Sequence, residues 1–272
     1  MLVRTGLFGL IMCFATPLAL AETLAKVYPV KNFSEFTSGG NTRVEITQSG
    51  TEYLRSEADA EVMERVKVDQ TGNRVSVWLK SGNGGFLSWF GQGNEKVKVT
   101  LGVKQLQYLE LSGGANATLG DLQGSEFKLE TSGAANVNFA RLTMDEVRMG
   151  LSGAANVRID TLTTKTQSYD LSGASNVEIK GASRSDELEV GASGASNFRG
   201  KPLSVTQAKV SASGASHIKV SVTESLVADA SGASYFLAAG ALCGGEVVIR
   251  GVPAQGSLQG DTAFAQVIAR FG

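Results

Sequence analysis

Cysteine and histidine are almost absent from this chain of 272 residues, which has two cysteines and one histidine. Cys13 lies in the apolar N-terminal stretch, so only Cys243 would remain once that stretch is removed, and a single cysteine cannot form an internal disulfide. The lone His217 excludes a metal site built from several histidines. We therefore expect a fold stabilised by packing, with no bound metal or cofactor.

An excess of charge of either sign is also missing. The chain has 25 basic and 26 acidic residues, so its formal net charge is −1. This balance gives no electrostatic support for binding nucleic acid or an anionic membrane surface. After the N-terminal stretch, no apolar run reaches the roughly 18 residues that a transmembrane helix needs. We expect a mature chain without a transmembrane span that binds no nucleic acid.

Residues 1–21 have the pattern of a secretory signal peptide. Arg4 precedes an apolar stretch from Leu7 to Ala15, and small residues at 18–21 provide a cleavage site. The mature chain is expected to begin at Glu22. This predicts export to the periplasm or the outside of a Gram-negative-type cell.

A phrase of serine, glycine and alanine followed two residues later by asparagine recurs along most of the chain. The period of about 20 residues is too short for two packed helices, and β-branched residues fill the intervals. A solenoid in which each repeat forms one coil explains such a period. The serines that begin the phrases are Ser112, Ser132, Ser152, Ser172, Ser193, Ser213 and Ser231.

Apolar residues alternate with polar ones on both sides of each phrase. Val137 and Phe139 follow one phrase, and Val147 and Met149 precede the next, which predicts two strands with one buried face joined by a bend. A third apolar position recurs ten residues after the serine and indicates a further strand or corner. Its members are Leu122, Leu142, Leu162 and Leu203. Since parallel crossovers are nearly always right-handed, the prediction is an all-β, right-handed parallel β-helix with three-sided coils.

Glycine and asparagine hold fixed places in each phrase. Glycine suits a bend with a positive φ angle or without room for a side chain. These glycines are Gly113, Gly133, Gly153, Gly173, Gly194, Gly214 and Gly232. An asparagine amide can bond its neighbour in the next coil, which contributes about 1 kcal/mol net when buried. We interpret the asparagines as structural; they are Asn116, Asn136, Asn156, Asn176 and Asn197.

Charged residues form an outward row two places after the asparagines, and we interpret this row as a solvated ladder. Its members are Arg158, Glu178, Arg199 and Lys219.

The chain divides into a signal peptide (1–21), an irregular N-terminal β segment with a first coil and cap (22–101), regular coils (102–240) and C-terminal coils with a cap (241–272). Terminal repeats are expected to be atypical because they must cover open strand edges. The expected elements outside the regular coils are a first coil at Phe33–Gln48, a short helix within Ala58–Arg65, and strands at Asn73–Lys80, Glu95–Leu101, Glu246–Ile249 and Ala263–Ala269.

The N-terminal segment together with the Ser-Gly-Ala-x-Asn coils resembles the head GIN domain family, described as putative auto-transporter adhesins. The resemblance extends from about Phe33 to Tyr235 and includes the strands between Val66 and Leu79. It implies a secreted, envelope-associated β-solenoid with an adhesin-like role. No translocator barrel follows the repeats here, so the resemblance does not extend to self-display on the cell surface.

The loop at 81–94 is the leading candidate for ligand binding. Phe86, Trp89 and Phe90 lie between glycine-rich flanks, where exposed apolar side chains are costly unless something covers them. These aromatics could stack on a sugar ring, a partner protein or the membrane interface. Alternatively, the loop folds back and caps the N-terminal end of the solenoid.

A polysaccharide-acting enzyme is the second class that we consider. Glu110 and Glu130 should stack one coil apart, with Lys128 and Arg148 beside them, and paired carboxylates suit glycoside chemistry. Charged outer strands produce such pairs by chance, and Gly150 interrupts the row. We favour a solvated face and assign no catalytic residue.

Taken together, the residues predict a non-enzymatic, secreted, envelope-associated β-solenoid that acts as a binding or structural module, adhesin-like in character. The expected partners are a glycan or an envelope protein, and self-association of the rods is open. A β-helix enzyme and an envelope regulatory or sensing component are the alternatives.

Overall fold

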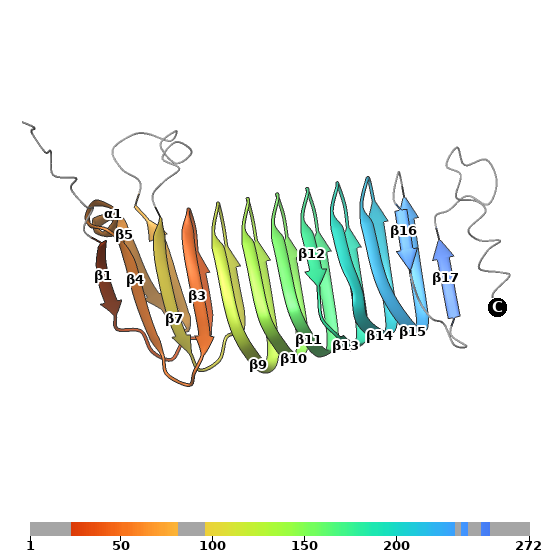
Figure 1. Ribbon diagram of the computed structural model, residues 1–272, viewed down its shortest axis with the longest axis horizontal. Coiled ribbons are helices and arrows are strands. Elements are labelled where there is room, and N and C mark those ends of the chain that lie inside the picture. Colours follow the sequence, from red (N-terminus) through yellow and green to blue (C-terminus); the bar gives the residue numbers. More distant parts are fainter. Residues whose placement is uncertain (1–22, 81–95, 232–234, 239–245, 251–272) are drawn as a thin grey trace, which may run out of the picture.

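The computed structural model describes residues 23–80, 96–231, 235–238 and 246–250, which form a rod-shaped β-solenoid of about six turns (Figure 1). All 17 strands of this described part belong to one continuous sheet. The predicted all-β solenoid is therefore confirmed, while its right-handed winding stays a prediction.

Within the described residues, the N-terminal part contains β1 (Thr23–Tyr28), β2 (Glu35–Ser38), β3 (Thr42–Gln48), β4 (Tyr53–Asp59), α1 (Ala60–Arg65), β5 (Val66–Thr71), β6 (Arg74–Leu79) and β7 (Val97–Val103). The regular coils consist of β8 (Tyr108–Leu111), β9 (Asn116–Thr131), β10 (Asn136–Leu151), β11 (Asn156–Leu171), β12 (Asn176–Ile179), β13 (Ser183–Ala192), β14 (Asn197–Ser213) and β15 (His217–Ser231). The described C-terminal strands are β16 (Tyr235–Ala238) and β17 (Glu246–Arg250).

Each regular coil has three sides, as the apolar pattern predicts. In β10 the alternation of buried and exposed residues breaks at Ala140–Arg141 and again at Asp145–Glu146, and the Ser-Gly-Ala turn makes the third corner. We call the side at Asn136–Phe139 and its equivalents the post-turn face. The side at Glu146–Leu151 and its equivalents is the pre-turn face. Successive coils stack in parallel, with β10 between β9 and β11.

The three-sided section encloses one continuous apolar core. The predicted third apolar positions are all buried, with Leu142 facing Leu122 and Leu162 in the neighbouring coils. Aromatic rings fill the wider parts of the core, as where the Tyr169 and Phe198 rings lie 4.9 Å apart. The core therefore stabilises the rod through contacts between adjacent coils.

The Ser-Gly-Ala turns stack backbone on backbone. The turn glycines have positive φ angles at six of the seven expected positions, from Gly113 to Gly214, and Gly232 lies outside the described residues. At Gly153, where φ is 80°, a Cβ atom would lie 2.5 Å from the carbonyl oxygen of Gly133. Glycine is needed there both for the backbone angle and for the close approach.

The asparagines form the predicted amide ladder along the rod. Each Nδ2 group donates to the Oδ1 atom of the asparagine one coil earlier, at distances of 3.0, 3.1, 3.0 and 2.8 Å. The ladder begins at Asn116 and runs to Asn197, whose neighbour in the next coil is His217. Because the same Nδ2 groups also bond a carbonyl oxygen of their own turn, the ladder ties the turns to one another.

Replacing Asn156 by alanine is expected to lower the free energy of unfolding by about 2 kcal/mol. The substitution removes the bonds that Asn156 makes to Asn136 and Asn176, each of which contributes about 1 kcal/mol net. Urea unfolding monitored by circular dichroism would measure the loss. Asn138→Ala is the matched control, because this exposed residue lies two places after a ladder position and should change stability by less than about 0.5 kcal/mol. Equal losses in both variants would contradict a stabilising role for the ladder.

The predicted first coil is present. The β2 and β3 strands pair in parallel with β8 and β9, so that Phe36 lies opposite Leu109 and Ile46 opposite Leu119. The predicted helix is α1, which buries Val62 at the N-terminal end of the rod (Figure 1). The predicted strands at Asn73–Lys80, Glu95–Leu101 and Glu246–Ile249 correspond to β6, β7 and β17, whereas Ala263–Ala269 lies outside the described residues.

Antiparallel pairing in the N-terminal part was not predicted. The β1–β4, β4–β7 and β5–β6 pairs are antiparallel, unlike those of the regular coils. The segment from β4 to β6, which lies between β3 and β7 in the sequence, turns back on itself. The β3 and β7 strands pair with each other in parallel. This arrangement covers the first coil at one end of the rod.

Candidate functional site

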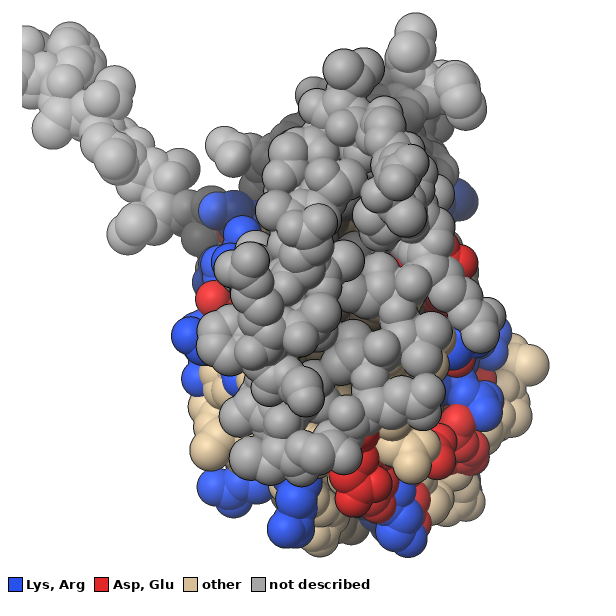
Figure 2. Space-filling view, turned by 90° about the vertical axis from the view of Figure 1, so that its right-hand side faces the viewer, with Lys and Arg blue, Asp and Glu red and all other residues tan. Residues whose placement is uncertain are grey.

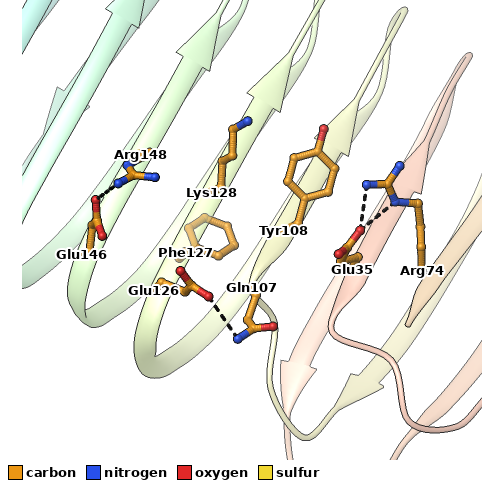
Figure 3. Close-up of a pocket in the computed structure, with 9 residues that line it drawn as sticks. All are labelled: Glu35, Arg74, Gln107, Tyr108, Glu126, Phe127, Lys128, Glu146 and Arg148. Carbon is orange, nitrogen blue, oxygen red and sulfur yellow. Dashed lines mark hydrogen bonds and ion pairs between the residues drawn. The ribbon is translucent and has the colours of Figure 1, made fainter. Parts of the chain in front are cut away.

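A charged groove of about 360 Å³ crosses the pre-turn face near its N-terminal end (Figure 3). Figure 3 shows Arg148, Lys128 and Tyr108 on neighbouring strands in that order, with Glu35 and Arg74 beyond Tyr108. The groove therefore runs along the rod and across the coils. Its lining residues are Glu35, Arg74, Gln107, Tyr108, Glu126, Phe127, Lys128, Glu146 and Arg148.

Tyr108 is the central side chain of the groove. It points outward from β8, because the inward positions of that strand are Leu109 and Leu111. The Arg74 guanidinium carbon lies 5.1 Å from the centre of the Tyr108 ring, and the Lys128 Nζ atom lies 5.7 Å from it. Both distances are typical of cation–π contacts. The ring thus lies between two cations.

The Tyr108 hydroxyl is a neutral donor at ordinary pH. It donates a hydrogen bond to Glu110 Oε2 at 3.1 Å. Partial burial, with the negative charge of Glu110, raises the pKa of Tyr108 to about 12. The phenol therefore keeps its proton and presents a fixed aromatic surface with a polar edge.

The charged side chains around Tyr108 are already paired. Arg74 contacts Glu35 at 2.7 Å, and Arg148 contacts Glu146 at 2.5 Å. The lining contains three acidic and three basic residues, so the groove has no net charge. An anionic or cationic ligand would have to displace an existing partner, whereas hydroxyl groups could add hydrogen bonds to these pairs.

The structure places Glu110 and Glu130 opposite each other on β8 and β9, as the enzyme alternative requires. Both carboxylates are occupied, since Glu110 accepts from Tyr108 and Lys128 Nζ lies 2.6 Å from Glu130 Oε1. Within the described part of the chain, no group of three or more His, Cys, Asp or Glu residues could hold a metal ion. The arrangement is that of an ion-paired surface.

The predicted ligand-binding residues Phe86, Trp89 and Phe90 lie outside the described residues, as do the predicted signal peptide and Cys243. Their roles stay predictions. Among the described residues, no helix is both long and apolar enough to cross a bilayer.

The sequence interpretation named Lys128, Arg148 and the two glutamates of this face but missed Tyr108 and Arg74. The outward alternation of Tyr108–Leu111 could have revealed Tyr108, because that residue begins the row that continues to Lys128 and Arg148. Local sequence offers no such signal for Arg74, which reaches the groove through the pairing of β6 with β2.

Comparison with known families gives one match over most of the chain. Residues 32–241 match the family described as "Putative auto-transporter adhesin, head GIN domain".

Several solved structures have a similar fold. A putative adhesin from Parabacteroides distasonis aligns with a TM-score of 0.72 at 18% identity, covering 85% of this chain and 95% of its own. A putative adhesin from Parabacteroides merdae aligns with a TM-score of 0.70 at 17% identity, covering 86% of this chain and 95% of its own. A putative lipid binding protein from Parabacteroides distasonis aligns with a TM-score of 0.57 at 16% identity, covering 85% of this chain and 97% of its own. At these identities the likeness establishes the fold alone.

Curated sequences match only a short segment. Over 44 residues the chain is 61% identical to 3-phosphoshikimate 1-carboxyvinyltransferases of Shewanella piezotolerans and Cellvibrio japonicus. The match covers 16% of this chain and 10% of each of those proteins. The chain therefore spans about a tenth of the length of the curated relatives that it matches, and this segment carries no argument about activity.

Proposed function

This chain belongs to the head GIN domain family, and we propose that it is a non-enzymatic, exported binding module whose pre-turn face holds an extended, uncharged glycan. The observation that carries the proposal is the Tyr108 ring, fixed between two cations in a groove of balanced charge that runs along the rod. An envelope or extracellular location accords with the family description and with the predicted signal peptide at residues 1–21.

The groove suits a sugar chain in three respects. The part of the Tyr108 ring that is left exposed between the two cations supplies apolar contact area for a sugar ring, and its hydroxyl oxygen can accept a hydrogen bond from a sugar hydroxyl. Paired carboxylates, guanidinium groups and the Gln107 amide supply fixed donors and acceptors. Adjacent coils are about 4.8 Å apart, which is comparable with the length of one sugar unit, so successive sugars would meet successive coils.

Replacing Tyr108 by alanine is expected to weaken glycan binding about 10- to 30-fold. The substitution removes the central aromatic surface, and losing a buried aromatic contact of this kind costs about 1.5 to 2 kcal/mol in binding. Titration calorimetry with soluble linear β-1,4-glucan and chitin oligosaccharides would measure the dissociation constants. Tyr108→Phe should retain most of the affinity because it preserves the ring.

Two controls make the experiment specific. Ser168→Ala alters the same outward row two coils from Lys128 and should leave binding unchanged. A double variant, Trp89→Ser with Phe90→Ser, tests the predicted aromatic loop separately. The proposal fails if no neutral glycan binds, or if binding is lost in the loop variant and retained in Tyr108→Ala.

A further inference from the structure

A second hollow of about 320 Å³ lies on the post-turn face, in the C-terminal half of the described coils. Its lining is strongly unbalanced in charge, with four basic residues and one acidic residue, Glu178. Viewed from the C-terminal end, charged side chains of both signs lie along the lower rim and both sides of the rod (Figure 2). The four basic residues are Lys180, Arg199, Lys201 and Lys219.

Three of these cations lack an acidic partner. Glu178 is the register partner of Arg199 on β12, but its carboxylate is paired with Arg158 on the preceding coil, at 3.4 Å. Lys180 lies 3.8 Å from Asp160. Arg199, Lys201 and Lys219 have no ion-pair partner within the part of the chain that the structure describes. All three are exposed, so their charged ends are free to meet a ligand.

The stacking of the coils forces two of these cations together. Arg199 and Lys219 are register partners on the adjacent parallel strands β14 and β15, about 4.8 Å apart. Like charges directly opposite one another destabilise a sheet. Lys128 and Arg148 also face one another on the pre-turn face, but each of them has an ion-pair partner, Glu130 and Glu146 respectively, whereas Arg199 and Lys219 have none among the described residues. An anion between Arg199 and Lys219 would convert the repulsion into two attractions.

The hollow results from an irregularity of the coil. The register between β14 and β15 shifts between Gly200 and Ser204, so that Lys201 and Pro202 have no register partner on β15. Both residues are exposed and line the hollow, where Lys201 adds a cation and Pro202 an apolar wall. Bulges of this kind reorient side chains and are common next to functional sites.

We propose that this hollow binds a phosphate group. The planar Arg199 guanidinium can bond two phosphate oxygens at once, and Lys201 and Lys219 supply point charges around the same anion. The group could be free phosphate or the headgroup of an anionic lipid, which share this chemistry. The site lies on a different face from the Tyr108 groove and does not depend on its function.

The test compares the purified protein with Arg199→Gln/Lys219→Gln, using inorganic phosphate as the probe in titration calorimetry. We expect the double variant to bind phosphate at least tenfold more weakly. Lys165→Gln/Lys209→Gln is the control; it removes the same charge from lysines that are paired with Asp145 and Glu189 and should bind within twofold of the parent. An equal loss in both variants, or no binding by the parent, would overturn the proposal.

A thermal measurement checks that the fold is intact. Without phosphate, Arg199→Gln/Lys219→Gln should melt at or above the parent temperature because it relieves repulsion. With phosphate, only the parent and the control should gain stability, and a double variant that gains as much as the parent would overturn the proposal.

A vesicle experiment distinguishes the two sources of phosphate, with phosphatidylglycerol vesicles as the probe and phosphatidylcholine vesicles for comparison. Selective binding to phosphatidylglycerol that free phosphate inhibits assigns a lipid headgroup. Phosphate binding without vesicle binding assigns a soluble ligand. Tyr108→Ala should retain phosphate binding in every arm.

Discussion

Replacing Gly153 by alanine is expected to lower the free energy of unfolding by about 4 kcal/mol. The φ angle of 80° costs a residue with a side chain about 1 to 2 kcal/mol. The new methyl group would also lie 2.5 Å from the carbonyl oxygen of Gly133, and relieving such a clash typically costs a further 1 to 3 kcal/mol. Urea unfolding of the purified variant would measure the change.

Gly150→Ala is the control for this substitution. Gly150 lies three residues before Gly153, in β10, its φ angle is not positive, and a Cβ atom there would meet nothing within 4 Å. Its stability should stay the same or rise by about 0.5 kcal/mol, because alanine restricts the unfolded chain more than glycine does. A Gly153→Ala protein as stable as Gly150→Ala would show that the turns tolerate a side chain, contrary to the stacked geometry.

Replacing Tyr169 by alanine is expected to lower the free energy of unfolding by about 4 kcal/mol. The side chain is fully buried, its ring contacts Phe198, and its hydroxyl donates to Gln167 Oε1 at 2.8 Å. Loss of a buried aromatic ring leaves a cavity that typically costs 3 to 5 kcal/mol. Gln167 would also lose the hydrogen bond to its Oε1 atom, and its Nε2 group has no hydrogen-bond partner among the described residues. Thermal and urea unfolding would measure the loss.

Tyr169→Phe separates the ring from the hydroxyl. It should lower the free energy of unfolding by only about 1 to 2 kcal/mol, and adding Gln167→Leu should restore most of that by removing both polar partners.

Burial raises the pKa of Tyr169 above its usual value of 10.0. The free energy of unfolding is therefore unaffected by this group below about pH 10. It declines as the pH rises further, because the unfolded chain then loses a proton that the folded chain keeps. Tyr169→Phe should therefore show a shallower alkaline decline than the parent. An identical decline would mean that this phenol is not buried.

The regular coils could be predicted from the sequence because their determinants are local and repeated. A glycine with positive φ is followed three residues later by an asparagine in the five turns from Gly113 to Gly194, and His217 takes that place after Gly214. The amide ladder follows from the period of about 20 residues. The predicted facing of Glu110 and Glu130 is confirmed for the same reason, since register alone determines it.

The N-terminal part and the Tyr108 groove depend on contacts that are distant in sequence. The alternation in β4 and β5 indicates strands, but alternation does not distinguish a parallel partner from an antiparallel one. Arg74 and Glu35 come together only because β6 pairs with β2, and Tyr108 joins them because β8 pairs with the other edge of β2. These pairings leave no periodic trace in the chain.

The offset of 20 residues between the stacked coils from β9 to β11 makes this part of the rod modular in whole periods. Residues 20 apart face one another from β9 to β11, so adding or losing one complete period would change the length of the rod and keep each side chain on its own face. A change of one residue within a strand would instead exchange its interior and exterior sides. The chain adds one residue at a corner, between β12 and β13, where the offset changes from 20 to 21. Duplication of gene segments that encode whole coils can thus lengthen such a protein without disturbing its faces. The number of coils between the Tyr108 groove and the hollow near Arg199 would then set the distance between these two sites.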